Sequence, residues 1–109
     1  MKIDLSRAME AVDGDRTLLK ELISDFMNDY PRQLEHIRSV VESGDAEQVE
    51  RFAHGLKGSI GVFGAQEAYH LAYQLECMGK KGELSGADAI LRRFEQEVQE
   101  LVLFFDDHG

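Results

Sequence analysis

The chain has 109 residues, enough for one domain with a modest hydrophobic core. Its 12 Lys and Arg residues against 21 Asp and Glu residues give a formal charge of −9, and such a surface repels nucleic acid and anionic membranes. A single cysteine excludes a disulfide framework, and no apolar run reaches the roughly 18 residues that span a bilayer, so we expect one cytoplasmic domain over residues 1–109. We also expect this domain to be a monomer.

The chain is predicted to begin with a short helix. Asp4 or Ser6 can cap this helix, which runs to about Val12. The following Asp13-Gly14-Asp15 is typical of a break between helices.

A long helix is predicted from Asp15, its N-cap, to about Ser43. Its apolar positions recur at spacings of three and four and form one stripe: Leu19, Leu22, Phe26, Tyr30, Leu34, Ile37 and Val41. Pro31 lies inside this helix. Because proline lacks an N–H group and clashes with the preceding turn, we expect a kink or a split near Tyr30.

Three further helices follow, each with its own start or stop signal. Asp45 caps the first, Gly79 and Gly82 end the second, which starts at Ala65, and Ser85 caps the third. The connections between them are short, which favours antiparallel neighbours. The predicted fold is therefore all-α: an antiparallel up-down four-helix bundle with a short additional N-terminal helix and a kinked or split first long helix.

The helix after residue 45 has a histidine on its outer face. Its buried stripe is expected to consist of Val49, Phe52, Leu56, Ser59 or Ile60, and Phe63. His54 lies about 200° from Phe52 and Leu56, at about 100° per residue, and therefore points away from the core. Arg51 and Lys57 share this outer face and form a local positive spot on an acidic chain.

Three glycines surround the histidine: Gly55, Gly58 and Gly61. Each costs a helix roughly 0.5–1 kcal/mol relative to alanine, so a helix needed only for its fold would not favour them. They leave open space for a partner surface to approach the imidazole. Lys57 places a cation where an anion at the ring would sit, and a neutral imidazole is a nucleophile. The pattern indicates that His54 accepts a phosphoryl group.

The same segment resembles a known family. Its residues Ala53-His54-Gly55-Leu56-Lys57-Gly58-Ser59, followed by Gly64-Ala65 and Leu75-Glu76, are similar to the signature of histidine-containing phosphotransfer (HPt) domains. These domains are relay modules of multistep two-component phosphorelays. The resemblance covers nearly the whole chain, and it implies that His54 is phosphorylated, that Lys57 assists and that Gly58 gives steric access.

The resemblance also implies which partners the domain has. They would be response-regulator receiver domains, which supply the aspartate and the magnesium ion. A histidine kinase, in the same or another chain, would be a further possible partner. The chain itself would need no cofactor and no metal, and would be a phosphotransfer protein, not an enzyme with its own ATP site. In agreement, the sequence contains no glycine-rich nucleotide loop.

Two polar residues of the following helix are candidates for orienting the imidazole. An antiparallel hairpin brings this helix beside the histidine helix, and the resemblance implies that Glu76 lies close to the ring. Gln66 is the second candidate.

A docking surface is predicted from apolar residues in excess of one core stripe. We expect the first short helix to pack near His54, so that an apolar patch borders the ring and meets a receiver. The patch would consist of Met9, Val12, Leu19 and Ile23 with Gly55, Gly58 and Gly61, and Arg51 would add polar contacts.

Two other functions are compatible with a helical bundle. Glu67 and His70 have the Glu-x-x-His spacing of metal-binding four-helix bundles, but only one such pair occurs and it lies at the edge of its apolar stripe. A scaffold bundle without chemistry is the second alternative, and uptake of phosphate distinguishes it from a phosphotransfer domain.

Overall fold

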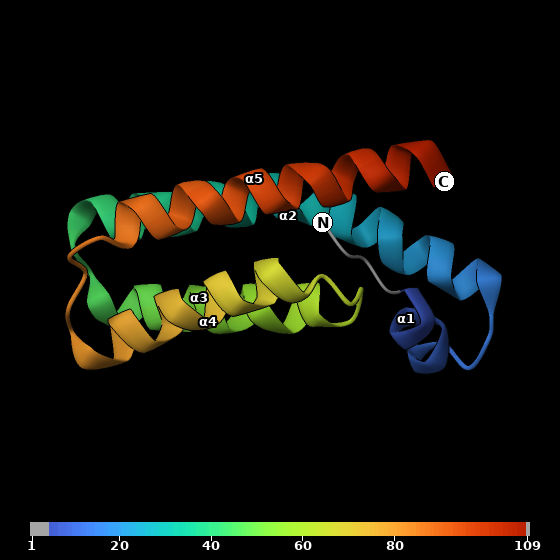
Figure 1. Cartoon of the computed structure of the whole chain (residues 1–109), viewed down its shortest axis with the longest axis horizontal. Helices are drawn as coiled ribbons and strands as arrows, with labels where there is room; N and C mark the ends of the chain where they lie inside the picture. Colours follow the sequence, from blue (N-terminus) through green and yellow to red (C-terminus); the bar gives the residue numbers. More distant parts are fainter. Residues whose placement is uncertain (1–4, 109) are drawn as a thin grey trace.

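Helices are the only regular secondary structure in the part of the chain that the structure describes (Figure 1). The computed structural model describes residues 5–108, in which no strand occurs. The helices are α1 (Leu5–Ala11), α2 (Arg16–Ser43), α3 (Ala46–Gly61), α4 (Gln66–Lys81) and α5 (Ala87–His108). The prediction of an all-α fold is confirmed.

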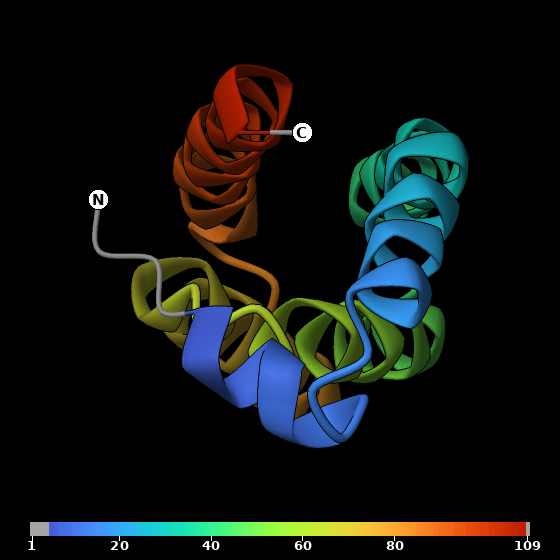
Figure 2. The ribbon, with the colours of Figure 1, turned by 90° about the vertical axis from the view of Figure 1, so that its right-hand side faces the viewer.

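The four long helices surround one core. α2 and α4 each pack against both α3 and α5, and the end-on view shows α2 and α5 above the α3–α4 pair (Figure 2). The molecule is elongated, with extents of 41 × 22 × 22 Å.

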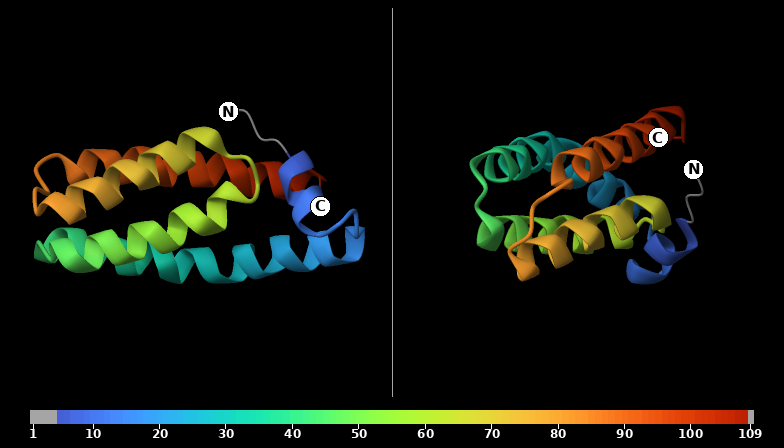
Figure 3. Two further views of the ribbon diagram at one scale, coloured as in Figure 1. Left: turned by 90° about the horizontal axis from the view of Figure 1, so that it is seen from below. Right: turned by 60° about the vertical axis from the view of Figure 1, so that its left-hand side comes forward.

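α1 lies at one end of the molecule, below the start of α2 in the view of Figure 1 and beside the connection between α3 and α4 (Figure 3). Asp13 and Gly14, with φ of 54° and 77°, turn the chain from α1 into α2. Ala8 is fully buried and joins α1 to the core. Asp4, one of the two candidate caps of this helix, lies outside the described residues.

Local capping signals set the starts of α2 and α3 and the ends of α2 and α4. The Asp15 carboxylate accepts hydrogen bonds from the backbone N–H groups of Thr17 and Leu18, and that of Asp45 accepts one from Gln48. The C-terminal ends of α2 and α4 are Gly44 and Gly82, with left-handed φ of 75° and 72°. Glycine is favoured at both because it has no Cβ to clash there.

α2 is one continuous helix that runs through Pro31. The alternative of two separate helices is therefore wrong. Phe26 and Ile37 are buried on either side of the proline, whereas Pro31 itself is exposed. Packing on both sides keeps the chain helical across the hydrogen bond that proline cannot make.

The core below α3 is aromatic at one end. Phe63 lies 5.4 Å from Phe26 and 4.9 Å from Phe105 between ring centroids, in edge-to-face geometry. The buried stripe of α3 itself consists of Val49, Ala53, Leu56 and Ile60. Phe52, which we expected in this stripe, is only half-buried, because its ring faces α2 and lies 5.5 Å from that of His36.

α3 and α4 approach each other closely at Gly79. A Cβ atom on Gly79 would lie 2.5 Å from the backbone nitrogen of Glu50 and 2.7 Å from the carbonyl oxygen of Ala46. The prediction that Gly79 helps to end its helix is wrong, since α4 continues to Lys81. Gly79 instead allows two helix backbones to touch.

Candidate functional site

His54 stands exposed on the middle of α3. Its side chain is 69% accessible, because Ala53 and Leu56 occupy the buried face of the helix. A Cβ atom added to Gly55 or Gly58 would have no other atom within 4 Å. The surface beside the imidazole is therefore open to a partner.

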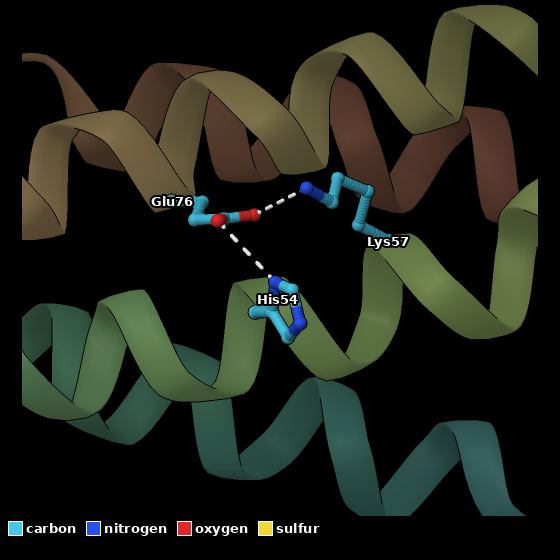
Figure 4. Close-up of polar contacts among 3 residues, drawn as sticks. All are labelled: His54, Lys57 and Glu76. Carbon is cyan, nitrogen blue, oxygen red and sulfur yellow. Dashed lines mark hydrogen bonds and ion pairs between the residues drawn. The ribbon is translucent and has the colours of Figure 1, made fainter.

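α4 runs beside α3 in the opposite direction (Figure 1) and places Glu76 beside the histidine. The Oε2 atom of Glu76 lies 3.3 Å from Nδ1 of His54, and its Oε1 atom lies 2.9 Å from Nζ of Lys57 (Figure 4). Oε1 is buried, and the whole Glu76 side chain is 14% exposed. One carboxylate thus joins the imidazole to the ammonium group.

The charges of this cluster stabilise one another. The Lys57 ammonium lowers the pKa of Glu76 below its ordinary value, and the His54 contact adds to this effect against the opposing influence of burial. The same ion pair raises the pKa of Lys57. Glu76 and Lys57 are therefore both charged at neutral pH.

The Glu76 contact selects a tautomer of His54. An ionised carboxylate can only accept a hydrogen bond, so its contact with Nδ1 favours a proton on that nitrogen. In the neutral ring the lone pair then belongs to Nε2. Figure 4 shows this second ring nitrogen turned away from the carboxylate.

Lys57 is directed toward α4. Its Nζ atom lies 5.2 Å from the ring centroid of Tyr73 and 5.9 Å from that of Tyr69, within the range of cation–π attraction. The Lys57 side chain is only 16% exposed. Sequence reasoning found the lysine but missed the two tyrosines, which are one helical turn apart and could have been noticed as an exposed aromatic pair.

A hollow borders His54 on the side of α2. Residues of α2 form one wall, and Gly55 and Gly58 of α3 contribute to the other. The residues of α2 that line this hollow are Leu22, Asp25, Phe26, Asp29 and Gln33. Our sequence reasoning placed Leu22 and Phe26 in the core stripe and missed this surface, although spacings of three and four relate its members.

A second hollow borders His54 on the side of α4. Arg51 lines it, together with Glu76 and Lys80. Arg51 is exposed, and the structure therefore brings it to the same face as His54, as its position in the helix predicts.

Two residues that were predicted to surround His54, Gly61 and Gln66, do not border it. The expectation of open space at Gly61 is wrong, because an added Cβ would lie 3.3 Å from the ring of Tyr69. Gln66 begins α4, ten residues before Glu76, and ten residues of helix span about 15 Å. It lines a hollow with Gly61 and Arg7, so its predicted position near the imidazole is also wrong.

The predicted position of the apolar docking patch beside the imidazole is wrong as well. Met9, Leu19 and Ile23 line a hollow with Leu5 and Phe105, and His54 does not belong to it. Val12 is buried. The physical reason is the position of α1, which packs at the end of the bundle (Figures 1 and 3). His54, by contrast, lies halfway along α3, which runs from Ala46 to Gly61.

The geometry does not support a metal site inside the bundle. Glu67 and His70 are both exposed, whereas the ligands of a metal-binding bundle project inward. Within residues 5–108, no group of three or more His, Cys, Asp or Glu side chains could hold a metal ion. None of the helices in this range is both long and apolar enough to cross a bilayer.

Comparison with known proteins places the chain in a family. The family model described as the Hpt domain matches residues 21–103. The structure is similar to the crystal structure of histidine-containing phosphotransfer protein B (HptB) from Pseudomonas aeruginosa PAO1, with a TM-score of 0.89 and 23% identity over 97% of this chain and 92% of the other. No curated protein sequence matches. Since the family model covers well over half of its length, the chain belongs to the Hpt domain family.

Proposed function

We propose that this chain is a phosphorelay intermediate of two-component signal transduction and that His54 is its phosphoacceptor. The lone pair of Nε2 forms the N–P bond as the P–O bond of a receiver's aspartyl phosphate breaks, and the electron pair of that bond stays on the aspartate carboxylate. The proton on Nδ1 remains in place. The reverse step passes the group to a second receiver.

The exposure of His54 is the observation that carries this proposal. A phosphoryl group passes in line between the two proteins, so the acceptor nitrogen must reach into the partner's site. His54 is 69% exposed, and the space beside Gly55 and Gly58 is open. Glu76 supports the reaction through Nδ1, because it leaves Nε2 free to attack.

In this proposal the partner protein supplies the phosphoryl donor and the metal ion of the reaction. A receiver domain brings the aspartate and the magnesium ion, while this chain acts without an ATP site, cofactor or metal of its own. We propose that the receiver docks over the hollow between α2 and α3, with Arg51 as a polar contact. We further propose that the domain is monomeric and cytoplasmic. We also propose that its four long helices alternate in direction, and the short connections between them support this arrangement.

Phosphorylation of the purified chain tests the proposal. The chain is incubated with phosphorylated receiver domains of the source organism, and an acid-labile, base-stable label is followed. His54→Gln should abolish labelling, while His70→Gln, which changes another exposed histidine of the same domain, should leave it unchanged. Labelling that survives His54→Gln would contradict the assignment, and a wild-type chain that takes up no label would favour the scaffold alternative.

A further inference from the structure

Lys57 already has an anionic partner. Its ammonium group is 2.9 Å from the buried Oε1 atom of Glu76, and Tyr69 and Tyr73 flank it. A lysine reserved for a phosphoryl group would be expected to project beside the imidazole. Here the side chain instead leaves α3 in the direction of α4, and Figure 4 shows its ammonium group turned to the carboxylate.

The same ammonium group can also serve a phosphoryl group on His54. Lys57 follows His54 by three residues, so both side chains leave neighbouring positions on one face of α3. Glu76 contacts the Nδ1 edge of the ring, and a group on Nε2 would extend from the opposite edge. The lysine arm is long and rotatable, which allows it to turn from the carboxylate to the phosphoryl oxygens.

We propose that Glu76 and the phosphoryl group on His54 compete for Lys57, and that this competition sets how readily the chain gives up its phosphoryl group. The inference rests on the proposed function of His54. In the unphosphorylated chain Glu76, Tyr69 and Tyr73 hold the ammonium group. In the phosphorylated chain Lys57 turns to the dianion, and Glu76 loses its cation.

The movement of Lys57 from Glu76 to the phosphoryl group makes the phosphorylated state less favourable. When Lys57 leaves, the buried Oε1 atom of Glu76 loses its ion-pair partner, and an unpaired buried charge is unfavourable. Glu76 also remains close to a new double negative charge. Both effects favour transfer of the phosphoryl group to a receiver, so Glu76 acts as a positioning residue that limits how strongly Lys57 retains it.

The equilibrium of His54 phosphorylation tests the competition without a partner protein. The chain is held in fixed mixtures of phosphoramidate and ammonium, in which phosphoryl transfer to the imidazole releases ammonia, and the ratio of phosphorylated to free chain is measured by intact mass. Glu76→Gln keeps an oxygen that can accept from Nδ1 but removes the charge. We expect it to raise this ratio about tenfold, the size of a coupling between contacting groups.

A double-mutant cycle with Lys57→Met separates the two effects of Glu76. In the Lys57→Met background there is no ammonium group that could move from Glu76 to the phosphoryl group. Glu76→Gln should then raise the ratio only about twofold, because it removes the repulsion between the Glu76 carboxylate and the phosphoryl group. Equal effects in both backgrounds would overturn the competition. Glu83→Gln, which removes an exposed charge in the connection after α4, is the matched control and should leave the ratio unchanged.

A second measurement examines the resting ion pair alone. In the unphosphorylated chain, the ¹⁵N resonance of the Lys57 ammonium group should titrate at lower pH in Glu76→Gln than in the wild type. An unchanged titration would overturn the inference even where His54 is phosphorylated normally. If the wild type takes up no phosphoryl group while the titration does shift, the proposed function fails and the competition fails with it, although the ion pair stands.

Discussion

Gly79 of α4 lies directly against the backbone of Glu50 in α3, at a distance that leaves no room for a side chain. This contact lies one helical turn beyond Glu76. The spacing of the two helices that it allows also brings the Glu76 carboxylate within 3.3 Å of the imidazole. A glycine outside the cluster of His54, Lys57 and Glu76 thereby positions the acid that contacts His54.

Gly79→Ala should destabilise the domain and slow phosphorylation together. The added methyl group would force α3 and α4 apart, and overpacking of this kind costs about 1–3 kcal/mol. Urea unfolding and the initial rate of phosphoryl uptake measure the two effects. Gly55→Ala is the control for stability, since its methyl group meets open space and should stabilise the helix by roughly 0.5–1 kcal/mol. A Gly79→Ala variant as stable as the wild type would contradict the close contact.

Gly58→Gln should separate stability from activity. Glutamine favours a helix over glycine, so the free energy of unfolding should rise by roughly 0.5–1 kcal/mol. The longer side chain would occupy the open space beside His54, and transfer from a receiver should fall by at least about tenfold, since about 1.4 kcal/mol lost in docking corresponds to this factor. Phosphoramidate, a much smaller donor, should be affected less. Loss of stability and activity together would indicate that Gly58 has a packing role.

Leu22→Ala should weaken receiver binding more than Met9→Ala does. Both side chains are partly buried, but Leu22 lines the hollow beside His54, whereas Met9 lines the hollow next to α1. Loss of one apolar anchor should raise Kd about tenfold for Leu22→Ala. Calorimetric titration with the receiver measures this difference. The reverse order would place the docking surface at α1.

Glu97→Gln should stabilise the domain at neutral pH. Burial raises the pKa of the Glu97 carboxyl group on α5, and the neighbouring carboxylates of Glu67 and Glu100 add to this effect. A raised pKa means that the folded state favours the protonated form, so stability is lost as pH rises through that pKa. The variant should have a higher Tm than the wild type at pH 7, and this gain should disappear below about pH 4, where the carboxyl group is protonated in both the folded and the unfolded state.

Glu76→Gln should show the opposite pH dependence of stability, because Lys57 lowers the pKa of Glu76. Its carboxylate stabilises the fold above the ordinary pKa, and this contribution is lost as pH falls through the lowered value. Thermal unfolding of both variants between about pH 3 and pH 7 provides the comparison. Parallel curves for the two variants would contradict the assigned pKa directions.

The features that the sequence predicts well are local. Asp15 and Asp45 cap their helices, and Gly44 and Gly82 end theirs, because each signal depends on a few adjacent residues. The outward position of His54 also follows from helical periodicity alone. These signals suffice for the fold class and for the histidine.

The surroundings of His54 depend on how the helices pack, and periodicity does not determine this. On α2 the apolar residues Leu19 and Ile23 lie next to Leu22 and Phe26, so two neighbouring faces are equally plausible partners for α3. In the structure, the face of α2 that carries Leu22 and Phe26 lies beside the histidine. Likewise, the long side chain of Lys57 could point to either side of the ring, and contacts with α4 decide its direction.

Pro31 removes one backbone hydrogen bond from the middle of α2, although the helix is continuous there. Proline has no amide hydrogen, so the carbonyl oxygen of Met27 receives no helical hydrogen bond from residue 31, four positions later. This turn of α2 therefore has one fewer backbone hydrogen bond than the turns on either side of it. The residues of α2 that line the hollow beside His54 lie on both sides of this turn, with Leu22 and Phe26 before Pro31 and Gln33 after it. The wall of the proposed docking site therefore includes the turn of α2 at which proline interrupts the backbone hydrogen bonding.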